Sequence, residues 1–98
     1  MLFKKHKSYR EVIAICDTEL LGKKFEEGEK NIEIKDHFFK GEEKTEEEIL
    51  KEIEIASAED STFNIVGEKS IKTALKAGII KENGITTIQE IPIALVLL

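Results

Sequence analysis

Short runs in which apolar and polar residues alternate make up much of the chain, and this pattern is typical of β-strands. Residues 10–16 end in five continuous apolar positions, which indicates a central strand covered on at least one face. Residues 2–7 are rich in lysine, as expected of an edge strand protected against unwanted pairing. Residues 24–26 and 31–35 alternate on either side of Gly28 and predict a second hairpin.

Two stretches have the apolar spacing of helices instead. The first begins with Thr45 and Glu48, whose separation is that of a capping box, and an apolar stripe follows them. The second is predicted over residues 68–77, and Gly78 stands where a helix commonly ends in the left-handed conformation.

The remaining segments complete a mixed pattern of strands and helices. Residues 17–22 predict a short turn of helix with Asp17 as its N-cap. Pro92 is expected at an edge or bulge between the last two strands. Because strands and helices do not alternate strictly, we expect one α+β domain over residues 1–98, a two-layer structure with a mainly antiparallel sheet covered by two helices. The other predicted strands are residues 63–66, 85–91 and 93–98.

Charge is distributed unevenly along the chain, whose net charge is −5. Residues 1–25 carry six basic and three acidic side chains, whereas residues 26–60 carry five basic and fourteen acidic ones. One interpretation is an acidic face that meets a basic protein partner. The other is a solvated surface that keeps the protein soluble. No run approaches the roughly 18 apolar residues that a membrane span needs, so we expect a cytoplasmic protein without a membrane contact.

The basic beginning of the chain offers a different partner. Lys5, Lys7 and Arg10 are the candidate contacts to nucleic-acid phosphates. Alternation along a strand would place Lys4 and His6 on the opposite face, which divides the basic patch. The acidic net charge and the few aromatic residues disfavour direct nucleic-acid binding.

Cys16 and Asp17 are the residues with the most evident chemical potential. A thiol beside a helix N-terminus can be a nucleophile, but no motif fixes a histidine near it. The alternative is a buried cysteine that ends a strand, followed by a capping aspartate. His6 and His37 have no metal-binding spacing, so the sequence predicts no metal site, no cofactor and no catalytic residue.

Four segments together resemble a known family. They are Cys-Asp-Thr-Glu-Leu-Leu-Gly-Lys at 16–23, Phe-Phe-Lys-Gly at 38–41, Asn-Ile-Val-Gly-Glu at 64–68 and Ala-Leu-Lys-Ala-Gly-Ile-Ile at 74–80. Their order and spacing are similar to those of the archaeal domain of unknown function family 424. The resemblance implies a two-layer α+β fold in an archaeal cytoplasmic protein, without an established activity. Members commonly carry Pro-His-Ala where this chain has Pro92, Ile93 and Ala94, which argues against an invariant catalytic histidine.

Some residues of these motifs are not required by the local turns and helices, and at those positions we expect an interaction surface. Asn64 is a polar residue in an apolar run, and it is either an interior hydrogen-bonding anchor or a partner contact. The function predicted is a non-catalytic interaction module in a protein or ribonucleoprotein complex, with translation as one setting. The alternatives are a small enzyme or ligand-binding protein with its site at Cys16 and Asp17, and an RNA-binding protein. The candidate surface residues are Asp17, Leu21, Gly22, Lys23, Asn64 and Gly67.

Overall fold

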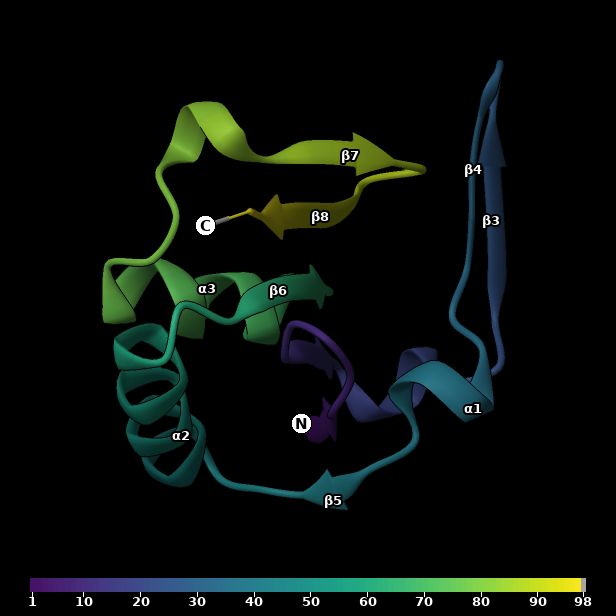
Figure 1. The fold of residues 1–98 in the computed structure, drawn as a ribbon. Coiled ribbons are helices and arrows are strands. Elements are labelled where there is room, and N and C mark those ends of the chain that lie inside the picture. The colour runs from purple at the N-terminus through teal and green to yellow at the C-terminus, as the bar shows by residue number, and fades with distance from the viewer. Residues whose placement is uncertain (98) are drawn as a thin grey trace.

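The computed structural model describes residues 1–97 and contains a six-stranded mixed sheet, a separate two-stranded sheet and three α-helices (Figure 1). The predicted α+β class is therefore confirmed. The strands are β1 (Leu2–His6), β2 (Val12–Cys16), β3 (Lys24–Glu27), β4 (Lys30–Glu33), β5 (Glu42–Glu43), β6 (Thr62–Val66), β7 (Thr86–Ile88) and β8 (Ile91–Val96). The helices are α1 (Asp36–Phe39), α2 (Glu46–Ala58) and α3 (Glu68–Ala77), and η1 (Thr18–Leu20) and η2 (Glu82–Gly84) are short 3₁₀ turns.

The order of strands in the large sheet brings distant segments together. It runs β5-β1-β2-β6-β8-β7, and β2 and β6 are parallel while the other neighbours are antiparallel. In the parallel pair Cys16 lies beside Val66. The carboxyl ends of both strands therefore meet at one edge of the sheet, where Asp17 and Gly67 follow them.

Both faces of the sheet are covered, by different elements. On one face a core that includes Phe3, Ile13 and Ile65 packs against α2 and α3. On the other face, alternate residues such as Cys16 and Val66 pack with residues of η1, α1 and the β3–β4 hairpin. The continuous apolar run of β2 follows from this arrangement, because successive side chains enter opposite cores.

The two long helices form where their local signals predict them. The Thr45 hydroxyl accepts a hydrogen bond from the Glu48 amide at 3.2 Å, and the Glu48 carboxylate accepts one from the Thr45 amide at 2.9 Å. Helix α3 has the predicted bounds, and Gly78 ends it with a φ of 80°. In residues 1–97, every helix is too short or too polar to cross a bilayer.

The last hairpin differs from the prediction. Its turn lies at Gln89 and Glu90, both with positive φ, and Pro92 lies inside β8 opposite Thr87. The Pro92 carbonyl accepts a hydrogen bond from the Gly67 amide at 2.9 Å, and the amide hydrogen that proline lacks would point to the same side. Pro92 therefore removes no hydrogen bond from the β7–β8 ladder. Leu98, the end of the predicted strand, lies outside the described residues.

The β3–β4 hairpin, predicted correctly, stands apart from the large sheet (Figure 1). Its base is held where Phe25 and Ile32 pack against the second core. Farther out, the Gln89 amide donates to the Glu27 carboxylate at 2.7 Å, and the Gln89 side chain donates to the Glu26 carbonyl at 2.6 Å. The hairpin is therefore fixed to the β7–β8 turn.

Candidate functional site

Asp17 connects the end of β2 to the start of α3. Its buried carboxylate accepts hydrogen bonds from the Lys69 amide at 3.1 Å and from the Ser70 amide and hydroxyl, both at 2.8 Å. Its own amide donates to the Val66 carbonyl at 3.1 Å. The predicted capping role was assigned to the wrong helix, because Asp17 makes no side-chain cap bond to η1 and caps α3 instead.

Gly67 is required by this carboxylate. Its φ is 111°, and a Cβ atom added there would lie 2.4 Å from the Asp17 Cγ. No other residue fits without moving Asp17 or straining the backbone. The structure thus brings two of the six predicted surface residues into contact, and it assigns both to the packing of α3 against the sheet.

Cys16 is fully buried in the second core. Burial raises the pKa of its thiol to about 12, and the negative charge of Asp17 adds to the effect. The thiol is therefore protonated at neutral pH and is shielded from solvent, whereas a nucleophilic cysteine needs an accessible thiolate. With Cys16 protonated and Asp17 committed to α3, the alternative of a reactive site at these residues loses its basis. Among residues 1–97, no three His, Cys, Asp or Glu side chains gather as a metal site would require.

Leu21, Gly22 and Lys23 form the base of the β3–β4 hairpin. The Gly22 amide donates to the Ile34 carbonyl at 2.7 Å, and the Ile34 amide donates to the Lys23 carbonyl at 2.9 Å. Leu21 packs against the second core, and only Gly22 and Lys23 are exposed. Asn64 lies apart from them in the middle of β6, half-buried, with Ala14 and Leu95 as its neighbours across the sheet.

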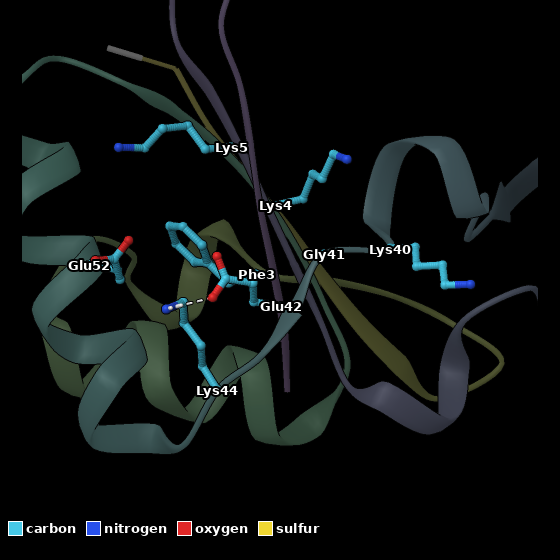
Figure 2. Close-up of a pocket in the computed structure, with 8 residues that line it drawn as sticks. All are labelled: Phe3, Lys4, Lys5, Lys40, Gly41, Glu42, Lys44 and Glu52. Carbon is cyan, nitrogen blue, oxygen red and sulfur yellow. Dashed lines mark ion pairs between the residues drawn. The ribbon is translucent and has the colours of Figure 1, made fainter.

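Sequence reasoning did not find one groove of the described surface. It is a groove of about 650 Å³ between the outer edge of β1, the segment before α2 and α2 itself (Figure 2). We call it the lysine groove. It is lined by Phe3, Lys4, Lys5, Lys40, Gly41, Glu42, Lys44 and Glu52.

The lysine groove straddles the edge of β1. Figure 2 shows Lys5, Lys44 and Glu52 around the Phe3 ring on the side of α2, and Lys4 on the side of α1. Strand β5 pairs with β1 at Leu2 and Phe3, and within the described residues no strand pairs with Lys4–His6 on this side.

Gly41 allows the two walls of the groove to meet. A Cβ atom at this position would lie 2.0 Å from the Phe3 carbonyl oxygen. In the sequence, the glycine of the Phe-Phe-Lys-Gly segment was the one indication that two stretches of backbone come close together here. Its partner on β1 could not be read from spacing, because the two segments are far apart in the chain.

The candidate nucleic-acid contacts lie in β1 and in the loop that follows it. Lys5 lines the lysine groove and lies 3.8 Å from the Glu11 carboxylate, whereas Lys7 and Arg10 are exposed in the loop after β1. His6 turns to the other face, where its ring stacks on Phe38 at 4.7 Å between centroids. Binding through Lys5, Lys7 and Arg10 stays a prediction.

Comparison with known proteins agrees with the sequence resemblance. The family described as protein of unknown function (DUF424) matches residues 5–98. The chain belongs to this family. The DUF424 chain is also similar to the crystal structure of an uncharacterized conserved protein from Methanopyrus kandleri, with 23% identity and a TM-score of 0.85 over 97% of this chain and 88% of that one. This likeness shows a shared fold. No curated protein matches the chain.

Proposed function

We propose that this DUF424 protein is a non-catalytic interaction module that binds a basic protein partner through the outer face of α2. Its setting is a cytoplasmic protein or ribonucleoprotein complex, with translation as the pathway we would examine first. The proposal assigns the acidic interface predicted from the sequence to one helix, α2.

Support comes first from the carboxylates of α2. Glu47 and Glu54 of α2, and Glu59 directly after it, are exposed, and within residues 1–97 none of them has an ion pair or side-chain hydrogen bond. Exposed carboxylates that form no ion pair attract lysine and arginine side chains and speed the encounter with a basic surface. Glu46 is different, because it pairs with Lys76 of α3 at 2.8 Å.

The observation that carries the proposal is Ile55. Its side chain is 55% exposed on the same helix, close in sequence to these carboxylates. An apolar side chain flanked by charges can be buried by a partner and then contributes contact area, while the carboxylates select a basic sequence. The helix presents them rigidly, since the capping box fixes its start and Ile49 and Ile53 anchor its inner face.

The hairpin is the other acidic element, and Figure 1 shows it at the opposite end of the molecule from α2. The acidic residues of the hairpin and those of α2 therefore lie in two separate regions. This separation provides a matched control, because the charge of acidic residues on the hairpin can be reversed without a change in α2.

The test is affinity capture from native cells with three versions of the protein. They are the wild type, a Glu47→Lys/Glu54→Lys variant and a Glu29→Lys/Glu33→Lys control that changes the net charge equally. Each capture is performed with and without nuclease, and bound proteins are identified by mass spectrometry.

Support would be a lysine- or arginine-rich protein that survives nuclease, binds the control and is lost from the α2 variant. Replacing Ile55 by Ser should weaken the same complex without removing a charge. The proposal fails if all three versions retain the same proteins, or if every partner disappears with nuclease.

A further inference from the structure

Another hollow lies between the two long helices, and we call it the α2–α3 groove. Its volume is about 350 Å³, and it is lined by Leu50, Ile53, Glu54 and Ser57 of α2 and by Ala77 at the end of α3. The α2 residues recur at intervals of three and four, so they form one stripe along the helix. This volume is at the low end for small-ligand sites and suits a single side chain.

The charge of the groove indicates the sign of its occupant. Among the described residues that line it, Glu54 alone is charged, and its exposed carboxylate forms no ion pair. Lys76 of α3 is engaged with Glu46 at 2.8 Å, and Lys51, three residues before Glu54, forms no ion pair with it. The groove therefore presents an uncompensated negative charge, which favours a cation.

The walls of the groove indicate what the cation is attached to. Leu50 and Ala77 are half-buried and Ile53 is buried, so two of the three apolar walls keep surface in contact with water. A bare metal ion would leave this apolar surface uncovered. Lysine and arginine side chains instead bury an aliphatic stem against such walls while the charged head reaches a carboxylate.

Ser57 adds a polar group that lacks a partner. Among residues 1–97, its hydroxyl oxygen is the only buried side-chain nitrogen or oxygen without a hydrogen bond. An unsatisfied buried hydroxyl is unfavourable and calls for an explanation. Because a hydroxyl group turns about a single bond, it can rotate toward a donor that enters the groove beside it.

We propose that the α2–α3 groove receives an arginine side chain of the basic partner, with its stem between Leu50 and Ala77 and its guanidinium on Glu54. The guanidinium pairs with a carboxylate through two parallel hydrogen bonds and still has an N–H for Ser57. It is also more weakly hydrated than the lysine ammonium, which suits a partly apolar site. The inference rests on the proposed function, because it names the residue type that engages α2, but its test needs no native partner.

The experiment follows amide signals of the full chain by NMR while short peptides are added. Each peptide is acetylated and amidated and carries one variable residue between alanines: arginine, lysine, citrulline or norleucine. The arginine peptide should shift signals of residues 50–57 and 77–78, with a dissociation constant on the order of 1 mM. Citrulline has the shape of arginine without its charge, and it should bind at least about ten-fold more weakly, as should norleucine. The lysine peptide should lie between them.

Variants then test the named side chains. Glu54→Gln should lower the affinity for the arginine peptide at least about ten-fold, to the level of citrulline. Ser57→Ala should lower it about three-fold. Ala77→Leu fills the groove without a change of charge and should abolish the shifts. Glu29→Gln, at an exposed position in the hairpin, is the control with the same change of charge. If Ala77→Leu fails to fold, Glu54→Gln carries the test, since its position is exposed.

The inference is overturned if no peptide shifts the groove signals, if citrulline or lysine binds as tightly as arginine, or if Glu29→Gln loses as much affinity as Glu54→Gln. Its failure can be told from that of the proposed function. A captured basic partner that is lost from the Glu47→Lys/Glu54→Lys variant but retained by Ala77→Leu would overturn the groove alone. Selective binding of the arginine peptide without a captured basic partner would support the groove and contradict the proposed function.

Discussion

Removal of the Asp17 carboxylate should destabilise the whole fold. Asp17→Ala leaves the Lys69 amide, the Ser70 amide and the Ser70 hydroxyl without the acceptor they share. Loss of an N-cap costs about 1 kcal/mol, and hydrogen bonds to a charged acceptor contribute about 1.5–3 kcal/mol each when buried. Because the three bonds share one acceptor and are not additive, we expect a loss of about 3 kcal/mol in the free energy of unfolding.

Urea unfolding followed by circular dichroism measures this loss. Asp17→Asn keeps the shape and one acceptor oxygen, so it should fall between the wild type and the alanine variant. Thr45→Ala removes a cap from an exposed helix start and should cost only about 1 kcal/mol, which makes it the matched control. If Asp17→Ala costs no more than Thr45→Ala, the carboxylate does not hold α3 to the sheet and our reasoning is wrong.

Three further predictions concern positions whose environment is well defined. Gly41→Ala should cost about 2 kcal/mol or more in urea unfolding, because its Cβ would meet strand backbone, whereas Gly84→Ala, with open space around it, should change stability by less than about 0.5 kcal/mol. The Thr45 amide and hydroxyl lower the pKa of Glu48, so the capping interaction stabilises the fold above the ordinary carboxyl pKa, and this stabilisation is lost as the pH falls through the lowered pKa. In Thr45→Ala, an NMR titration should show the pKa of Glu48 part-way back to its ordinary value. An unchanged pKa would contradict the capping box. Cys16 should react with a thiol reagent only at the rate of unfolding, and rapid labelling of the native protein at neutral pH would refute its burial.

Local signals account for what the sequence predicted well. Thr45 and Glu48 lie within one turn of the helix they cap, so their spacing alone specifies the contact. Gly78 likewise ends α3 through its own backbone conformation. The turn at Gln89 and Glu90 was missed because neither residue is one that usually adopts positive φ.

Contacts between distant segments explain what the sequence could not predict. The carboxylate of Asp17 reaches α3 only because β2 and β6 pair in parallel. The residues near Asp17 in the chain do not predict that pairing. The lysine groove similarly requires Gly41 to touch β1 and Lys44 to fold over Phe3. Sequence reasoning recognised Asp17 and Gly67 as residues of interest, but it assigned them to a surface when they form a buried contact.

The cap on α3 also has a consequence for the order of folding. The Lys69 and Ser70 amides receive their acceptor only when β2 and β6 are already side by side. In the unfolded chain the first turn of this helix therefore lacks its partner, and the closure of a long loop must come before the helix is stable. In the native protein, these two amides should exchange their hydrogens with solvent together with the central strands, as one cooperative unit, and not by fraying of a helix end.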